Sequence, residues 1–198
     1  MAETASRPQV TTWHLDYHGE IQSLPQWPAG VTLIEAEIAS PELNQFLFTA
    51  VGTPWRWYGR LGWTYQQWLA HLQSGHVRTW VLYQRGTPAG FYELCRHPAD
   101  ADSIELKYFG LLPSFVGQGL GGRLVQAAVA SAQQWSNGRV WLHTCSDDHP
   151  AALASYQKAG FVLCQTVVEP SEAPEDYATA ALDAAYVHSR LACFKQPE

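Results

Sequence analysis

Apolar and charged side chains alternate along residues 104–109, and this pattern predicts a β-strand that ends near Leu111. The two expected faces are formed by Ile104, Leu106 and Tyr108 on one side and by Glu105, Lys107 and Phe109 on the other. A turn rich in glycine follows, and residues 120–134 then have the Ala, Leu and Gln content and the apolar spacing of a helix. The rest of the chain is organised around this strand, turn and helix.

Similar patterns predict strands and helices on both sides of this unit. Strands are expected at residues 10–17, 31–38, 79–84, 90–95, 139–145 and 161–168. Helices are expected at residues 41–51 with Ser40 as N-cap, from Thr64 onward, and after Asp147 or Asp148, which can cap a helix that stops at Gly160. Residues 175–194 have a helical composition.

The glycine turn predicts a binding site for an anion. Its glycines are Gly117, Gly119, Gly121 and Gly122. The first backbone N–H groups of a helix lack internal partners, and glycine allows a phosphate to approach them closely. A phosphate loop of the GxxxxGK(S/T) type is excluded, because no Lys-Ser or Lys-Thr pair follows the glycines.

A dinucleotide fingerprint, GxGxxG, is matched by three of these glycines. That type of site also needs an acidic residue at the end of the next strand to bind a ribose, and none precedes Asp147. Its first strand is normally a buried apolar run, whereas this one carries Glu105 and Lys107. The match to this fingerprint is therefore weak evidence for a nucleotide-dependent oxidoreductase.

The composition indicates a globular protein with an acidic surface. Of the 198 residues, 46% are hydrophobic and 15% are charged, and the formal net charge is -6. We expect no nucleic-acid partner and no membrane partner, because the chain has no basic cluster and no apolar run long enough to span a bilayer. The four cysteines are far apart, which indicates reduced core residues, and with no apolar signal segment at the N-terminus we expect a cytoplasmic location.

The length fits a single domain. We expect it to cover residues 1–198, with a flexible tail at 1–9, an N-terminal extension at 10–30 and a C-terminal extension at 170–198. Whether the chain forms a homodimer is left open by the sequence.

Two motifs resemble those of the GNAT superfamily of acyl-CoA-dependent N-acyltransferases. Residues 116–121, VGQGLG, are similar to the family signature (Q/R)-x-x-G-x-(G/A), with Val116 in place of Gln or Arg. Residues 149–161, HPAALASYQKAGF, are similar to the later motif N-x-x-A-x-x-x-Y-x-K-x-G-F, with His149 in place of Asn. The resemblance is specific over residues 103–161.

The resemblance implies an α/β (α+β) fold with a central, twisted, mostly antiparallel mixed β-sheet flanked by helices. A final strand near residues 188–194 would fit this family better than a helix. The implied activity is acetyl-CoA-dependent transfer of an acetyl group to the primary amine of a small molecule by direct attack, without a metal. The alternatives are a protein lysine or N-terminal amine as acceptor, or an acyl-CoA sensor without catalytic activity.

The resemblance also implies roles for single residues. Glu105 is the candidate base, and its alternative is a strand carboxylate paired with Lys107. Tyr156 is the candidate acid for the thiolate. His143 is either a second base or a core residue bonded to the backbone, and we favour the core residue. The residues expected to bind the coenzyme are Phe109, Leu111, Leu112, Val116, Gly117, Gln118, Gly119, Leu120, Gly121, Gly122, Arg123 and His149.

Large aromatic residues are concentrated in residues 55–80, which follow the first expected helix and end in the strand after the second. They are Trp55, Trp57, Tyr58, Trp63, Tyr65, Trp68 and Trp80. Two interpretations account for such a set. In the first, the rings simply fill the core, as large rings do in a small domain. In the second, they form a wall over the acceptor site, which this segment overlies in the GNAT family. A wall of this kind would suit an amine with an apolar or cationic body.

Overall fold

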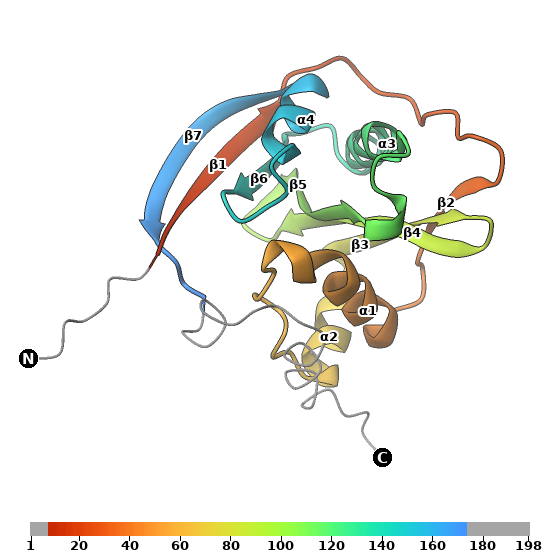
Figure 1. Ribbon diagram of the computed structural model, residues 1–198, viewed down its shortest axis with the longest axis horizontal. Coiled ribbons are helices and arrows are strands. Elements are labelled where there is room, and N and C mark those ends of the chain that lie inside the picture. Colours follow the sequence, from red (N-terminus) through yellow and green to blue (C-terminus); the bar gives the residue numbers. More distant parts are fainter. Residues whose placement is uncertain (1–7, 174–198) are drawn as a thin grey trace, which may run out of the picture.

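In residues 8–173, which the computed structural model describes, seven strands form one sheet (Figure 1). They are β1 (Gln9–Tyr17), β2 (Val31–Glu35), β3 (Val77–Gln84), β4 (Thr87–His97), β5 (Asp100–Leu111), β6 (Val140–Cys145) and β7 (Phe161–Pro170). Their order across the sheet is β2-β3-β4-β5-β6-β1-β7. Strands β5 and β6 pair in parallel, and the other neighbours pair antiparallel. The expected mixed, mostly antiparallel sheet is confirmed.

Helices flank this sheet on both sides. They are α1 (Pro41–Gly52), α2 (Tyr65–Leu72), α3 (Leu120–Trp135) and α4 (Ala152–Lys158), with short 3-10 turns at Thr53–Trp55 and Pro113–Phe115. In Figure 1, α3 and α4 lie on one side of the sheet, and α1 and α2 lie on the other. The larger core is under α3, where Leu106 of β5 and Leu124 of α3 are buried, and a smaller one joins Leu47 of α1 to Phe91 of β4.

Side chains cap the starts of α1 and α2 as the sequence predicts. The Ser40 hydroxyl accepts a hydrogen bond from the Leu43 N–H at 3.2 Å, and Thr64 and Gln67 form a reciprocal capping box. The expected cap of α4 is wrong. This helix begins at Ala152 without a side-chain cap, because the Asp148 carboxylate instead accepts a hydrogen bond from the Thr144 hydroxyl at 2.7 Å.

A bulge in β5 breaks the expected alternation of its side chains. Leu106 pairs with Leu94 of β4, and Tyr108 pairs with the preceding β4 residue, Glu93, so Lys107 is an extra residue in β5. Leu106 therefore packs under α3, whereas Tyr108 packs on the opposite side of the sheet with Phe48 of α1. The prediction that these two residues share a face was wrong, since a pattern of period two cannot reveal an inserted residue.

The N-terminal strand β1 lies between β6 and β7, so it is internal to the sheet. Its Leu15 is fully buried. The sequence predicted the strand but not this position. β2 is shorter than expected and ends at Glu35. No helix within residues 8–173 is both long and apolar enough to cross a bilayer. Our expectations for residues 1–7 and 174–198 lie outside the described part of the chain.

Candidate active site

The parallel strands β5 and β6 separate shortly after they meet. They pair only at Ile104 with Val140 and at Glu105 with Trp141. Beyond these pairs, residues 106–111 of β5, and His143 and Cys145 of β6, line a cavity of about 600 Å³. The gap between two parallel strands therefore provides an opening into the sheet beside the glycine turn.

One part of this cavity, which we call the coenzyme part, is lined by the glycine turn and α4. Gly117 and Gly119 have positive φ angles of 82° and 74°, and a Cβ at either position would project into open space. These positions need glycine for their backbone conformation. Gly119 is the N-cap of the 16-residue helix α3 and provides no side-chain cap, so the first N–H groups of that helix remain available to an anion.

The other residues that we expected to bind the coenzyme divide into two groups. Those that line the cavity with Gly117 and Gly119 are Phe109, Leu111, Val116, Gly121 and His149. Those that do not line it are Leu112, Gln118, Leu120, Gly122 and Arg123. In the second group, the Leu120 side chain is in the core, the Gln118 amide donates to the Ser114 carbonyl, and the Arg123 guanidinium faces the Gly119 carbonyl at 3.5 Å.

Tyr156 of α4 lines the same part of the cavity. Its ring makes edge contacts with Phe109 and Phe161, whose ring centroids lie 5.9 and 6.0 Å away. Burial raises the pKa of Tyr156 well above its ordinary value, and the charge of Asp148 acts in the same direction. The phenol therefore keeps its proton throughout the neutral range and can donate it.

Glu105 itself does not line the cavity, because its carboxylate is held behind two residues that do. Its Oε1 lies 3.2 Å from Nζ of Lys107 and 3.0 Å from Nδ1 of His143. Burial alone would raise the pKa of Glu105, but His143 and Lys107 together hold it below its usual value. His143 is 36% exposed and contacts this carboxylate, so the prediction that it is a core residue bonded to the backbone was wrong.

The aromatic segment consists of the loop at residues 55–63, which we call the aromatic loop, and of helix α2. It both packs in the core and lines the cavity. Trp55, Trp57 and Tyr58 line it, and Trp68 is buried beneath them. Trp57 also donates a hydrogen bond to Asp148 at 3.3 Å, which joins this loop to the turn after β6. Cavity lining and core packing are therefore divided between residues 55–58 and helix α2, and a wall over an acceptor site stays a prediction.

The same loop is anchored to the sheet by a buried ion pair that sequence reasoning missed. Arg60 donates to both carboxylate oxygens of Glu93, at 2.9 and 2.8 Å, and both side chains are nearly fully buried. The guanidinium also lies over the rings of Trp63 and Tyr108, 4.7 Å from each centroid. The available signal was Glu93 itself, which is a charged residue within an otherwise apolar strand segment.

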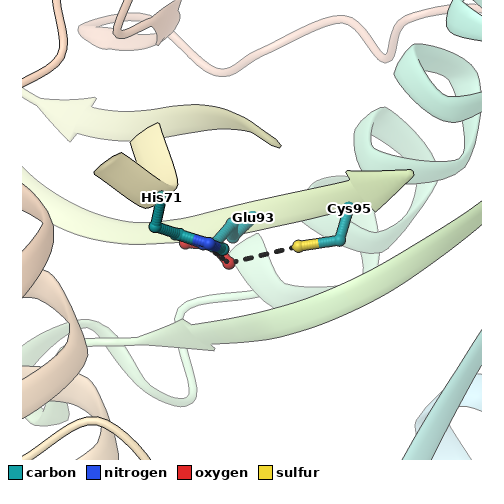
Figure 2. Close-up of side chains that lie close together, drawn as sticks. All are labelled: His71, Glu93 and Cys95. Atoms are coloured by element: carbon teal, nitrogen blue, oxygen red, sulfur yellow. Dashed lines mark hydrogen bonds and ion pairs between the residues drawn. The ribbon is translucent and has the colours of Figure 1, made fainter. Parts of the chain in front are cut away.

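Three possible metal ligands meet at this ion pair, as Figure 2 shows for His71, Glu93 and Cys95. His71 Nε2 and Cys95 Sγ each lie 3.4 Å from Oε1 of Glu93. A metal ion would have to displace the Arg60 guanidinium from both carboxylate oxygens, and like charge opposes its approach. The geometry therefore favours an internal ion pair over a metal site.

The remaining part of the cavity, which we call the acceptor part, is formed by the ends of β1 and β7 and by the aromatic loop. Val10 and Thr12 of β1 and Glu169 of β7 line it, together with Glu172 beyond that strand. None of these residues was predicted. Their contribution depends on the position of β1 between β6 and β7, which no local sequence pattern encodes.

Comparison with known proteins gives one family. Residues 41–161 match the model of the acetyltransferase (GNAT) family. No curated protein sequence matches the chain significantly. The matched segment includes the glycine turn, both motif regions and the separating strands.

Several solved structures share the fold. A GCN5-related N-acetyltransferase from Sphaerobacter thermophilus is 18% identical with a TM-score of 0.62, over 82% of this chain and 51% of that one. Another from Kribbella flavida is 20% identical with a TM-score of 0.53, over 86% of this chain and 60% of that one. An aminoglycoside acetyltransferase from an uncultured soil metagenomic sample is 14% identical with a TM-score of 0.50, over 66% and 87%. The chain thus spans about half to three-fifths of the first two proteins.

Proposed function

This chain belongs to the GNAT family of acetyltransferases, and on that premise we propose that it transfers the acetyl group of acetyl-CoA to the primary amine of a small molecule by direct attack. One observation carries the proposal. A single cavity brings together the start of α3 without a side-chain cap, the partly buried phenol of Tyr156, which keeps its proton, and the imidazole of His143. These are the elements that thioester aminolysis requires.

The coenzyme part suits the pyrophosphate and the thioester of acetyl-CoA. The N–H groups at the start of α3 would bind the pyrophosphate, since glycine leaves them uncovered. The thioester would then lie along residues 109–111 of β5, where the strand has separated from β6 and its backbone N–H groups can polarise the carbonyl.

The acceptor part suits a small cationic amine. Glu169 and Glu172 would attract an ammonium ion, and the aromatic residues Trp57 and Tyr58 line the same cavity. Residues 55–59 line the same cavity, whose volume of about 600 Å³ suits a compact substrate. The fold also accommodates this substrate class elsewhere, because one structural neighbour is described as an aminoglycoside acetyltransferase.

The reaction needs a catalytic group at two of its proton transfers. The ammonium group must lose a proton before its nitrogen can attack the thioester carbon, and the thiolate that leaves as the C–S bond breaks needs a proton. Tyr156 would supply the second proton. Glu105 would provide the basicity for the first, through the two side chains that separate it from the cavity.

Isothermal titration with acetyl-CoA tests the site. Gly119→Glu places a carboxylate at the anion site, and we expect it to weaken binding by at least about tenfold, which is 1.4 kcal/mol. Gly75→Glu is the matched control, because Gly75 has a φ of 75°, has open space at its Cβ and lies outside the cavity. Equal weakening in both variants would contradict the assigned coenzyme site.

The acceptor class is tested by thiol release. Wild-type protein is incubated with acetyl-CoA and either small primary amines or peptides that carry a lysine or a free N-terminus. Faster release with a small amine supports the proposal. Release with peptides alone would contradict the substrate class, and binding of NAD in place of acetyl-CoA would contradict the activity itself.

A further inference from the structure

Glu105 is poorly placed to take a proton from a substrate. Its side chain is only 13% exposed, and the wall of the cavity is formed by Lys107 and His143 in front of it. Both of these side chains approach the same carboxylate oxygen, Oε1, at 3.2 and 3.0 Å. A carboxylate that is covered and engaged in this way is a weak base.

His143 has the opposite properties. It is 36% exposed, and it projects from β6 into the region where β6 has separated from β5. A proton must lie between Nδ1 and Oε1 of Glu105, since two lone pairs at 3.0 Å would repel each other. The neutral ring therefore carries its proton on Nδ1 and keeps a lone pair on Nε2. Within residues 8–173, Nε2 has no hydrogen-bond partner.

We infer that His143 is the base that takes the proton from the acceptor amine, and that Glu105 is a positioning residue that fixes the tautomer of the ring. This inference rests on the proposed function. It deepens that function by moving the first proton transfer from the buried carboxylate to the imidazole in front of it.

The step balances without another reactant. The ammonium group transfers a proton to Nε2 of His143, and its nitrogen then forms the bond to the thioester carbon. The attacking nitrogen releases its second proton to solvent, the C–S bond breaks, and the sulfur takes a proton from the Tyr156 hydroxyl. The imidazolium that results is stabilised by the Glu105 carboxylate beside Nδ1. The imidazolium returns its proton to solvent, and the phenol regains one from solvent, so that one proton is released in each turnover.

Several charged or titratable groups face the imidazole and set its behaviour. Glu105 and Lys107 face it from β5, His14 lies beside it on β1 with ring centroids 5.8 Å apart, and Cys145 follows on β6. A protonated His143 cannot accept the proton of the amine, so kcat/KM must fall on the acid side of its pH profile.

Two substitutions separate a catalytic role from a structural one. His143→Asn retains a donor close to the position of Nδ1, so it keeps the contact with Glu105 and removes Nε2. His143→Ala removes both. If His143 is the base, both variants lose about 100-fold in kcat, both lose the acid limb of the pH profile, and both keep acetyl-CoA affinity within about twofold. Wild-type-like activity in His143→Asn would overturn the inference.

A second measurement does not depend on activity. In protein labelled with ¹⁵N-histidine, the His143 signals are assigned by their loss in His143→Asn, and their chemical shifts report the tautomer. We expect the Nδ1–H form in the wild type and a shift toward the Nε2–H form in Glu105→Ala. An Nε2–H form in the wild type would overturn the inference.

The two measurements also separate this inference from the proposed function. If the wild type transfers acetyl groups to no amine, the proposed function fails and the base assignment fails with it. If the wild type is active and the His143 variants keep its rate and its pH profile, the proposed function stands and the base assignment alone is overturned.

Discussion

At the scale of single residues, the fold shifts the pKa values of Tyr156 and Glu105 in opposite directions. Burial raises the pKa of Tyr156, whereas His143 and Lys107 hold the pKa of Glu105 below its usual value despite burial. The tyrosine is therefore a protonated acid at neutral pH, and the glutamate is a charged group with partners. The family resemblance names both residues as candidates, but their protonation states depend on burial and on contacts between distant residues, such as that of Glu105 with His143 of β6.

Tyr156→Phe should lower kcat by about 100-fold without weakening acetyl-CoA binding, because it removes only the acid that protonates the thiolate. An acid must be protonated to act, and its raised pKa keeps it so at pH values above the ordinary value of 10.0. The wild-type rate should accordingly show no loss on the basic side up to about pH 10. Steady-state kinetics between pH 6 and pH 10 provide the check.

The control for this variant is Tyr17→Phe. Tyr17 also packs its ring against Phe161, with centroids 5.2 Å apart, but its hydroxyl bonds to the Glu20 carbonyl away from the cavity. A similar loss of kcat in both variants would assign the effect to packing around Phe161 and would remove Tyr156 from the mechanism.

At the scale of elements, the sequence was most informative where structure is local. The starts of α1 and α2 followed from Ser40 and Thr64, whose side chains bond within their own first turns. The bulge at Lys107 and the place of β1 were not predictable, since both are set by pairing between distant strands. The missed residues of the acceptor part, Val10 and Glu169, follow from the second of these failures.

The ion pair between Arg60 and Glu93 acts between two elements, because it joins the aromatic loop to β4. Arg60 and the contact with His71 lower the pKa of Glu93 to about 2, against the opposing effect of burial. A folded-state pKa below the unfolded value of 4.5 means that the stabilisation is present above about pH 5 and is lost as the pH falls toward 2.

Glu93→Gln should therefore reduce the free energy of unfolding at pH 7 by about 3–5 kcal/mol, since it leaves the Arg60 charge buried without a partner. The wild type should lose about 2 kcal/mol more than this variant between pH 5 and pH 3. Urea unfolding at the three pH values measures both effects. Glu35→Gln is the control, because Glu35 forms a similar bidentate pair with Arg78 that is partly exposed. Equal losses in the two variants would contradict the special role of burial.

At the scale of the whole molecule, the sheet consists of two parts that share little backbone pairing. Strands β2 to β5 form one part, and β6, β1 and β7 form the other. Only two residue pairs of β5 and β6 join them, with α3 packed across the junction. The separation that provides the cavity is thus also the place where the sheet is least supported by hydrogen bonds.

A ligand in this cavity touches both parts of the sheet, so binding should suppress local opening at their junction. At a concentration of 100 times its Kd, acetyl-CoA adds about 2.7 kcal/mol to the free energy of any local opening that releases the ligand. We expect amide hydrogen exchange to slow by about 100-fold in residues 107–111 and 140–145, and to change little in the hairpin turn at residues 84–87, which lies outside the cavity.

The Gly119→Glu variant is the control, and at the same acetyl-CoA concentration it should show much less protection. Equal protection of the β3–β4 hairpin would mean that the sheet opens as one unit, and protection confined to α3 would mean that the coenzyme binds the glycine turn without bridging β5 and β6.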